Sequence, residues 1–181
     1  MQYLEQSDLS KLFRVMYAGN KTHHQIALMC FFSGARISQV LRLQGQDIFE
    51  HNGKPVVQIS AAKRGFDRLH NLHIDDRPEF DMSPIIGIAK MRPLARLYGG
   101  TTRQYFNLLL KQSCVEAGIH TSFGHSHCWR HSSAMIVWME TKRLGAVSQF
   151  LAHRSASSAF AYLQENDGLM AQEAIDNVVL V

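Results

Sequence analysis

Two short stretches near the C-terminal end carry most of the chemical information in this chain: His-Ser-His-Cys-Trp-Arg-His at residues 125–131 and Leu-Ala-His-Arg-Ser-Ala-Ser-Ser-Ala-Phe-Ala-Tyr at residues 151–162. They place His127 three residues before Arg130, and His153 nine residues before Tyr162. At that spacing His127 and Arg130 share one face of any helix that contains both. Basic and imidazole groups beside a phenol are suited to binding a phosphate and letting the phenol attack it.

The composition is that of an ordinary globular domain. The chain has 181 residues, 46% hydrophobic and 19% charged, which is about one domain. A net charge of +4, with ten histidines in addition, mildly favours a polyanionic partner such as nucleic acid. The most apolar run, residues 26–32, is far shorter than the roughly 20 residues that span a membrane, and no N-terminal signal is present. The sequence therefore predicts a cytoplasmic protein.

The cysteines predict neither a disulfide framework nor a metal site. Cys30, Cys114 and Cys128 are odd in number and widely spaced, so we expect reduced thiols. Cys128 lies among histidines, but no second pair of Cys or His residues at a familiar spacing completes four zinc ligands. The phosphate-loop pattern Gly-x-x-x-x-Gly-Lys-[Ser/Thr] is absent, which argues against nucleotide hydrolysis. We expect no metal and no cofactor.

Hydrophobic periodicity predicts a mainly α domain with a small three-stranded antiparallel β-sheet. The strands are expected at residues 48–50, 55–60 and 69–74, separated by polar turns. Helices are expected at residues 4–18 (with Ser7 and Asp8 as the N-cap), 22–32, 35–43, 84–90, 142–153 and 157–165, between Thr102 and Gly118, and from residues 125–131 onward through Trp138. The helix at 22–32 ends in an apolar run on all sides, which is typical of a buried helix.

Two upstream basic residues and one tyrosine lie at suggestive places in these elements. Arg36 begins the third helix, where backbone N–H groups favour an anion, although an ordinary surface arginine is the alternative. Lys63 lies near the tip of the sheet, where a lysine is usually only solvated but can also reach a phosphate. Tyr162 lies about 80–100° from the centre of the apolar stripe of its helix, so we expect it at the edge of the stripe.

Taken in order, these residues resemble the active-site set of the tyrosine recombinase (phage integrase) family. The matching segments are Gly34-Ala35-Arg36-Ile37-Ser38-Gln39-Val40-Leu41-Arg42-Leu43, Ala62-Lys63-Arg64-Gly65, His127-Cys128-Trp129-Arg130-His131, and Leu151-Ala152-His153 with Tyr162 nine residues later. Any one segment is a weak signal, whereas four in order are specific. The resemblance covers about residues 5–165 and implies the family's catalytic-domain fold, that of DNA breaking-rejoining enzymes.

The resemblance implies a site-specific DNA recombinase of the integrase or invertase type, an enzyme of DNA recombination and integration found in mobile elements. It would cleave and rejoin DNA through a 3′-phosphotyrosyl intermediate without ATP, magnesium or a cofactor. The implied catalytic roles are phosphate binding by Arg36 and Arg130, a general base or orienting group at His127, an acid for the leaving 5′-oxygen at Lys63, a hydrogen bond to the phosphate from His153, and the nucleophile at Tyr162.

The resemblance also implies partners and a domain organisation. The partner is double-stranded DNA, on which the family works as a homotetramer, and a monomer stays open for the protein without DNA. We expect the catalytic domain at residues 1–168 and a C-terminal tail at 169–181 that either folds back or is exchanged with a neighbouring protomer. We expect the family's N-terminal core-binding domain to be absent from this sequence, which fits either a shortened chain or a natural short form of the family. The expected location is the cytoplasm, in association with the nucleoid.

Two residues depart from the family pattern. Gln39 stands where an acidic residue is usual; its amide can hydrogen-bond but cannot form an ion pair. Ala152 replaces the usual glycine before His153, which we expect to have little chemical consequence. Among the neighbouring histidines, His131 is interpreted as a packing or supporting residue and His125 as a loop residue.

Three alternatives to a recombinase stay open. Gln39 and the missing domain favour a non-catalytic DNA-binding module of the same fold. A type IB topoisomerase would share the chemistry but relax supercoils. A zinc-dependent hydrolase that uses His125, His127 and Cys128 is more remote.

Overall fold

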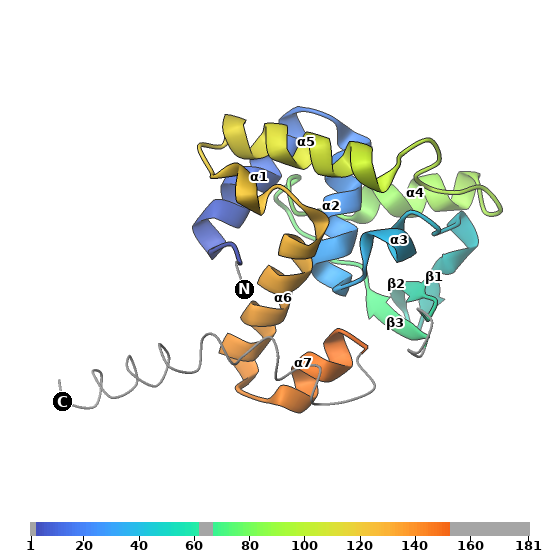
Figure 1. The fold of residues 1–181 in the computed structure, drawn as a ribbon. Helices are drawn as coiled ribbons and strands as arrows, with labels where there is room; N and C mark the ends of the chain where they lie inside the picture. Colours follow the sequence, from blue (N-terminus) through green and yellow to red (C-terminus); the bar gives the residue numbers. More distant parts are fainter. Residues whose placement is uncertain (1–2, 62–66, 153–181) are drawn as a thin grey trace.

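The structure, a computed structural model, describes residues 3–61 and 67–152. Within these ranges it is a mainly helical domain with a three-stranded antiparallel sheet, which confirms the predicted fold class (Figure 1). The elements are α1 (Gln6–Ala18), α2 (Lys21–Ser33), α3 (Ile37–Val40), η1 (Gly45–Asp47), β1 (Ile48–His51), β2 (Lys54–Ile59), β3 (Arg68–Asn71), α4 (Ser83–Met91), α5 (Arg103–Glu116), η2 (Thr121–Phe123), α6 (Ser126–Thr141) and α7 (Leu144–Phe150).

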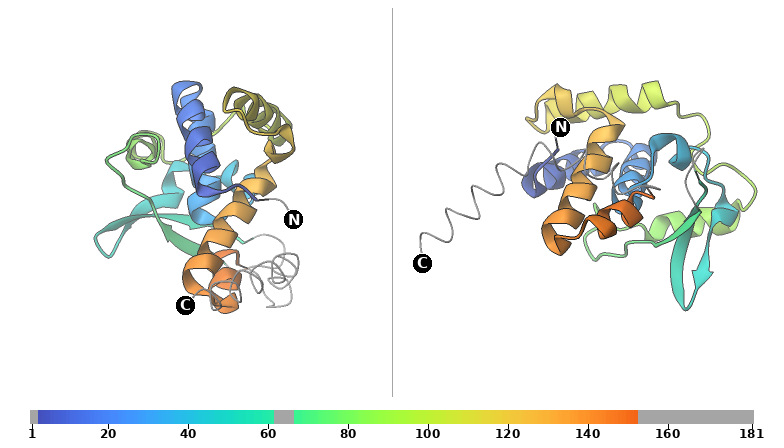
Figure 2. Two further views of the ribbon diagram at one scale, coloured as in Figure 1. Left: turned by 90° about the vertical axis from the view of Figure 1, so that its left-hand side faces the viewer. Right: turned by 60° about the horizontal axis from the view of Figure 1, so that its bottom comes forward.

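Helix α2 forms the centre of the core. Residues 26–30 all have an exposed fraction of 0%, as expected for a helix that is apolar on every side. Helices α1, α3 and α6 pack against it, and the views in Figures 1 and 2 place α2 among them. Aromatic rings fix this packing, because the Phe13 ring of α1 lies 4.8 Å from the Trp129 ring of α6 and 5.4 Å from the Phe31 ring of α2, centroid to centroid.

Helix α1 buries the predicted apolar face but does not begin as predicted. Ser7 and Asp8 lie inside the helix, and the N-cap is Glu5, whose side chain makes no capping hydrogen bond. The entry to α1 is fixed instead by tertiary structure, since the backbone N–H of Leu4 donates to Ser132 Oγ of α6 at 2.8 Å. The cap prediction was therefore wrong, because a contact with a distant residue replaced the local one.

Helix α3 is much shorter than the predicted helix at residues 35–43. Arg36 has an extended backbone (φ −72°, ψ 144°), so helical geometry starts only after it. At the other end, the chain beyond Val40 pairs with a distant segment: Leu97 N–H donates to the Leu43 carbonyl at 2.9 Å. That pairing continues where Gly45 N–H donates to the Ala95 carbonyl at 3.2 Å, so a longer helix would lose these bonds.

The sheet has the strand order β1-β2-β3 with both pairs antiparallel. Asn52 and Gly53, both with positive φ (51° and 72°), form the turn between β1 and β2, as two-residue hairpin turns require. Strand β3 ends at Asn71, earlier than the predicted 69–74. Leu72 N–H still donates to the Pro55 carbonyl at 2.9 Å, but Pro55 has no N–H to return, so the ladder stops there.

The remaining predicted helices have mixed outcomes. Helices α4 and α5 match, and Thr102 caps α5 by accepting a hydrogen bond from Tyr105 N–H at 3.2 Å. Helix α7 is shorter than the predicted 142–153, because Lys142 has a left-handed backbone (φ 51°) that separates it from α6. The predicted helix at 157–165 and the tail at 169–181 lie outside the described residues. Over the described ranges, no helix has the length and apolar character to cross a membrane.

Candidate functional site

Arg130 of α6 joins the C-terminal ends of two helices. Its guanidinium donates through Nη1 to the carbonyl of Gly34, just after α2, and through Nη2 to the carbonyl of Leu151, just after α7, the latter at 2.7 Å. The side chain is buried, with an exposed fraction of 1%. Carbonyls at helix C-termini lack intrahelical partners and carry partial negative charge, so a cation between two such ends stabilises both.

Arg68 of β3 repeats this arrangement one residue earlier on each helix. Its Nη1 donates to the Phe150 carbonyl at 2.7 Å, and its Nη2 donates to the Ser33 carbonyl at 3.2 Å. The two arginines therefore link consecutive carbonyls of α2 to consecutive carbonyls of α7. We call Ser33 and Gly34, together with Phe150 and Leu151, the α2–α7 junction. Arg68 was not singled out from the sequence, where it counts as one of several basic residues in a turn.

A glycine lets the two helix ends approach closely. Gly34 follows α2 with a left-handed backbone (φ 59°), and a Cβ placed on it would lie 2.5 Å from the Phe150 ring. The Phe150 ring thus packs directly on the glycine backbone. The segment that carries Arg36 and the segment that leads into His153 meet at this contact, although more than a hundred residues separate them in the sequence.

Arg36 lies two residues beyond the junction, at the N-cap of α3, with a half-buried side chain. Gln39 fixes its backbone: Oε1 accepts a hydrogen bond from the N–H of Arg36 at 3.1 Å, and Nε2 donates to the carbonyl of Ser60 at 2.7 Å. Ser60 directly follows β2, so Gln39 joins Arg36 to the strand that leads toward Lys63. The prediction that Gln39 hydrogen-bonds is confirmed, and one of its bonds needs an N–H that a carboxylate lacks.

Arg36, Arg68 and Arg130 form a positively charged cluster. Burial, and then the charges of Arg130 and Arg36, lower the pKa of Arg68 to about 10. Among the described residues, carboxylates of Asp8, Asp75 and Glu79 form ion pairs on α1 and along the loop before α4. Like charges that lie this close favour an anion between them, because the anion lowers their mutual repulsion.

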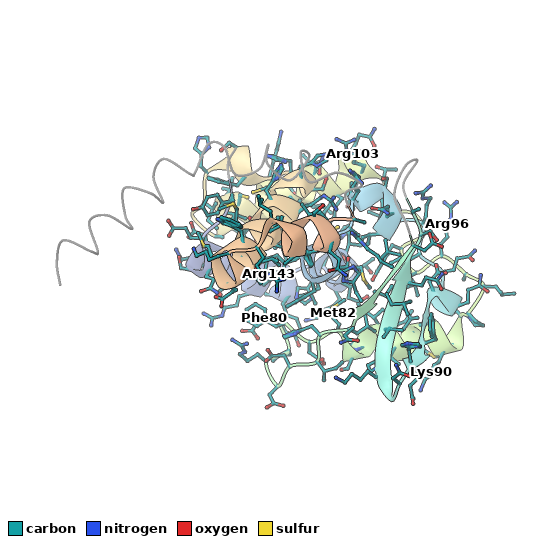
Figure 3. All side chains as sticks on the ribbon, turned by 90° about the horizontal axis from the view of Figure 1, so that it is seen from below. Phe80, Met82, Lys90, Arg96, Arg103 and Arg143 are labelled. Atoms are coloured by element: carbon teal, nitrogen blue, oxygen red, sulfur yellow. The ribbon has the colours of Figure 1, made fainter. Side chains whose placement is uncertain are left out.

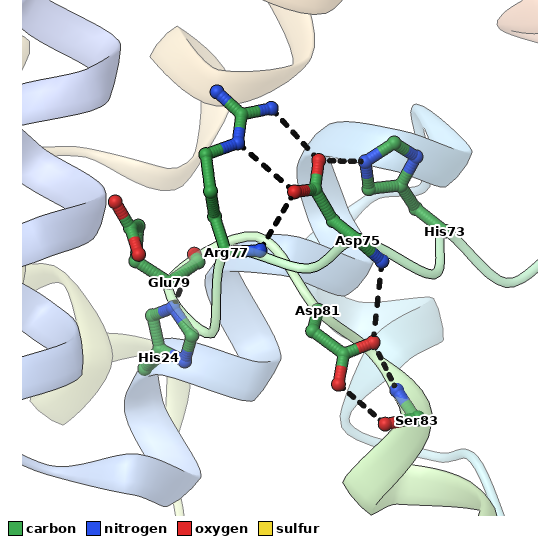
Figure 4. Close-up of polar contacts among 7 residues, drawn as sticks. All are labelled: His24, His73, Asp75, Arg77, Glu79, Asp81 and Ser83. Atoms are coloured by element: carbon green, nitrogen blue, oxygen red, sulfur yellow. Dashed lines mark hydrogen bonds and ion pairs between the residues drawn. The ribbon is translucent and has the colours of Figure 1, made fainter.

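The carboxylates of that loop are used locally (Figure 4). Arg77 donates to Asp75 through Nε and Nη2 at 2.9 Å and 2.8 Å, and these bonds hold the pKa of Asp75 well below its usual range. Asp81 accepts a hydrogen bond from the N–H of Ser83 at 3.0 Å. The Glu79 backbone is held as well, since its carbonyl accepts from His24 Nε2 at 2.8 Å.

His127 lies in the first turn of α6 with an exposed side chain. Desolvation by its neighbours, followed by the charge of Arg103, lowers its pKa, and Arg130 and Arg36 act in the same direction. His127 and Arg130 were predicted to share one face of a helix; both lie on α6, but Arg130 is buried whereas His127 is exposed. An imidazole that is neutral near pH 7 can accept a proton.

Two exposed arginines, Arg96 and Arg103, add positive charge to the surface of the domain. Arg103 begins α5, and Arg96 belongs to the segment that pairs with residues 43–46. Figure 3, in which the domain is seen from below, shows Arg103 and Arg96 at its edge. Of these two arginines, Arg103 lies near enough to His127 for its charge to lower the pKa of that imidazole.

The neighbours of His127 have structural roles. His125, interpreted from the sequence as a loop residue, is the N-cap of α6, and its Nδ1 accepts a hydrogen bond from Cys128 N–H at 3.2 Å. Sequence reasoning missed this because Ser, Thr, Asp and Asn are the usual caps. His131 is half-buried, and burial lowers its pKa to about 4, in agreement with a packing role.

The cysteines do not support the zinc alternative. Cys128 has an exposed fraction of 0%, and burial raises the pKa of its thiol to about 12, whereas His127 faces outward. In residues 3–61 and 67–152, no three His, Cys, Asp or Glu side chains are grouped as a metal would require. Cys30, Cys114 and Cys128 are all buried and unpaired thiols.

Three predicted site residues, Lys63, His153 and Tyr162, lie outside the described residues. The structure nevertheless describes what flanks two of them. The N–H of Ala61 donates to Asp67 Oδ1 at 2.6 Å, which joins the two ends of the segment that contains Lys63. Ala152, directly before His153, has a left-handed backbone with φ 50°. Such a conformation costs an ordinary residue about 1–2 kcal/mol, so the replaced glycine matters for the backbone, contrary to expectation.

The chain resembles known recombinases in sequence and in structure. No protein-family model matches it. The tyrosine recombinase XerH of Campylobacter jejuni is 23% identical over 179 residues, which cover 93% of this chain and 50% of that protein. This chain therefore spans about half the length of that relative.

Solved structures give the same result for the fold. XerH bound to palindromic difH substrate superposes with a TM-score of 0.73 at 16% identity, covering 96% of this chain and 52% of that one. XerA recombinase gives 0.68 at 16% identity, with coverages of 98% and 65%. The catalytic domain of bacteriophage HP1 integrase gives 0.65 at 18% identity, with coverages of 91% and 88%. The chain is therefore similar in sequence to a tyrosine recombinase, and it has the fold of these solved recombinases and of the HP1 integrase catalytic domain.

Proposed function

We propose that this chain is the catalytic domain of a site-specific DNA recombinase that cleaves DNA through Tyr162. The observation that carries the proposal is the cluster of Arg36, Arg68 and Arg130 at the α2–α7 junction, where hydrogen bonds to the same two helix ends hold Arg68 and Arg130. Such a cluster suits a phosphodiester, whose non-bridging oxygens gain negative charge during cleavage. The XerH structures contain difH DNA, which favours DNA as the substrate class here.

The proposed reaction exchanges one phosphodiester for another. The Tyr162 oxygen attacks phosphorus as its proton passes to His127, and the bond from phosphorus to the 5′-oxygen breaks. Lys63 gives a proton to that 5′-oxygen, while Arg36 and His153 bind the non-bridging oxygens. A 5′-hydroxyl from a partner strand then attacks the phosphotyrosine and restores the DNA backbone. Each step exchanges one phosphodiester bond for another, so the proposal needs no ATP. Arg36 and His153 bind the phosphate oxygens, so the proposal includes no metal ion.

Arg130 enters this reaction under a constraint. Its exposed fraction of 1% leaves a phosphate no direct path to the guanidinium. We therefore propose that DNA binding opens the site before Arg130 contacts the phosphate. Until then, the bonds from Arg130 to Gly34 and Leu151 keep its guanidinium at the junction and avoid the cost of ordering it later.

The assembly and location are part of the same proposal. Strand exchange requires two duplexes and four active sites, so we propose a homotetramer on double-stranded DNA, in the cytoplasm with the nucleoid. Residues 1–168 form the catalytic domain, and the tail at 169–181 either folds back or docks on a neighbouring protomer.

The test is covalent trapping on DNA of unknown sequence. The chain is incubated with a pool of duplexes that carry a randomised central segment and a nick, so that cleavage releases a short fragment and traps the 3′-phosphotyrosyl adduct. DNA that stays attached to protein under denaturing conditions is recovered and sequenced, and difH is tested as one defined duplex. We expect an adduct with the chain and with Tyr105→Phe, a control at an exposed tyrosine, but none with Tyr162→Phe.

The other outcomes separate the alternatives. DNA binding without an adduct, in the chain as in Tyr162→Phe, would favour the non-catalytic module. An adduct accompanied by relaxation of supercoiled plasmid, without exchange between two duplexes, would favour the topoisomerase.

A further inference from the structure

We propose that Arg68 is a positioning residue for the cleavage reaction, because its guanidinium holds the α2 end that carries Arg36 against the α7 end that leads into His153. This inference rests on the proposed function and adds a residue to it. Arg68 lies on β3, just past the turn that contains Lys63. Figures 1 and 2 show β3, the end of α2 and α7 gathered in one part of the domain.

The hydrogen bonds of Arg68 commit it to the protein rather than to a substrate. Both terminal nitrogens donate to backbone carbonyls, Nη1 to Phe150 at 2.7 Å and Nη2 to Ser33 at 3.2 Å. These carbonyls belong to different helices and to segments 117 residues apart in number, from Ser33 to Phe150. A side chain that bridges them acts on the reacting groups through the backbone, which is the behaviour of a positioning residue.

The two hydrogen bonds of Arg68 hold the backbone segments that lead from the junction to Arg36 and to His153. Ser33 is three residues before Arg36, and Phe150 is three residues before His153. Between Phe150 and His153 the chain passes through Ala152, whose left-handed backbone is unfavourable without external support. Arg68 and Arg130 both hold this segment by its carbonyls, so loss of Arg68 removes one of the two arginine contacts on the segment that leads to His153.

The geometry requires a planar, forked cation. A guanidinium presents two parallel N–H groups to two acceptors at once, whereas the ammonium of lysine is a single point with a rotating set of donors. A lysine at position 68 therefore keeps the positive charge of the cluster but cannot hold both carbonyls in the same way. A comparison of arginine with lysine at position 68 therefore distinguishes a role in holding both carbonyls from a contribution of positive charge to DNA binding.

A cavity beside Arg68 allows a second kind of test. It has a volume of about 450 Å³ and is lined by side chains of β3 and α7: Arg68, Leu69, His70, Ala146, Gln149 and Phe150. Truncation of Arg68 enlarges this space and removes the donors to the Ser33 and Phe150 carbonyls. Methylguanidinium added at millimolar concentration is small enough to enter and to donate to both carbonyls.

The experiment compares Arg68→Gln, Arg68→Lys and Arg68→Ala with the unmodified chain on a trapped-cleavage duplex. Arg42→Gln is the control, since Arg42 also donates to a backbone carbonyl, that of Ser38 at 3.0 Å, but within one exposed helix end. The measurements are the rate of adduct formation at saturating DNA, the dissociation constant for DNA, and the melting temperature.

We expect adduct formation by Arg68→Gln to slow at least tenfold at saturating DNA, at temperatures where the variant is folded, with a dissociation constant within about threefold of the unmodified value. Arg68→Lys should recover only part of the rate, and methylguanidinium should accelerate Arg68→Ala without accelerating Arg42→Gln. An adduct rate for Arg68→Gln within twofold of the unmodified chain would overturn the inference, as would full recovery by lysine, which would assign Arg68 to charge alone. If the unmodified chain forms no adduct, the proposed function itself fails.

Discussion

Gln39 illustrates how a single residue can depart from a family pattern and still be well suited to its place. Its exposed fraction is 7%, and its amide accepts from Arg36 N–H while donating to the Ser60 carbonyl. An acidic residue, the usual choice in the family, keeps the first bond but presents an oxygen to the Ser60 carbonyl. In this chain the amide is therefore the better fit.

Restoring the acidic residue should consequently harm the protein. We predict that Gln39→Glu lowers the free energy of unfolding by about 1–3 kcal/mol at pH 7, since a buried carbonyl loses its donor and faces a carboxylate. Urea denaturation measures the change, with Gln104→Glu at an exposed position of α5 as the control, expected within about 0.5 kcal/mol. A Gln39→Glu variant as stable as the unmodified chain would contradict the assigned hydrogen bonds.

Ala152 shows the opposite case, in which the departure has a cost. Its φ of 50° is unfavourable for any residue with a Cβ, whereas glycine adopts it readily. We predict that Ala152→Gly raises the free energy of unfolding by about 1 kcal/mol. The same substitution at Ala146, inside α7, should lower it by about 0.5–1 kcal/mol. Thermal or urea unfolding of the two variants checks the signs, and a loss of stability in Ala152→Gly would refute the left-handed assignment.

At the scale of elements, the α2–α7 junction depends on close contact between Gly34 and the Phe150 ring. A Cβ on Gly34 would lie 2.5 Å from that ring and would also adopt a positive φ. Gly118, which follows α5, has a similar φ of 69° but nothing within 4 Å of its Cβ position. The difference between alanine substitutions at the two glycines therefore isolates the contact with Phe150.

We predict that Gly34→Ala lowers the free energy of unfolding by about 1–3 kcal/mol more than Gly118→Ala does, because overpacking adds to the backbone strain. The excess should shrink when Phe150→Ala is combined with Gly34→Ala, since truncating the ring removes the overlap. Urea denaturation of the single and double variants measures both quantities. Equal losses at the two glycines would mean that the helix ends are farther apart than described.

Local patterns predicted the elements wherever packing follows from periodicity. The burial of α2 and the lengths of α4 and α5 agree with the prediction because the signals are local: the apolar run of α2, Pro84 near the start of α4, and the Thr102 cap of α5. The lengths of α3, α7 and β3 do not agree. Their ends are set by a distant segment that pairs with residues 43–46, by the positive φ of Lys142, and by the missing N–H of Pro55.

At the scale of the whole molecule, histidines with a lowered pKa make stability depend on pH. Burial, and then the charge of Arg68, lower the pKa of His70 from 6.5 to about 4. The native state thus favours the neutral imidazole, and the unfolded chain binds the proton first as the pH falls below 6.5. Stability is therefore fully present above pH 6.5 and is lost as the pH falls toward 4. His131 acts in the same direction, with a pKa lowered to about 4.

We predict that the free energy of unfolding falls between pH 7 and pH 5, with His70 contributing about 2 kcal/mol of the loss. In His70→Phe, which keeps an aromatic ring beside Phe150, the loss should be smaller by about that amount. Urea denaturation at a series of pH values measures both curves. Parallel curves for the two proteins would show that His70 does not take up a proton on unfolding.

The candidate site could be recognised from the sequence only in part. Arg36, His127 and Arg130 have characteristic spacings, and the structure brings their segments together at the α2–α7 junction. Arg68 had no such signal, because its partners are backbone carbonyls of residues that any sequence could supply. The burial of Arg130 was also invisible, since it follows from two helix ends that are distant in sequence.

The central claim is that this arginine cluster serves cleavage of DNA by Tyr162. The most direct measurement isolates the trapped protein–DNA adduct, digests it with protease and nuclease, and identifies by mass spectrometry the peptide that carries the residual nucleotide. We predict a nucleotide joined through its 3′-phosphate to Tyr162. A nucleotide attached to any other residue, or the absence of a covalent adduct on every duplex that the protein binds, would contradict it.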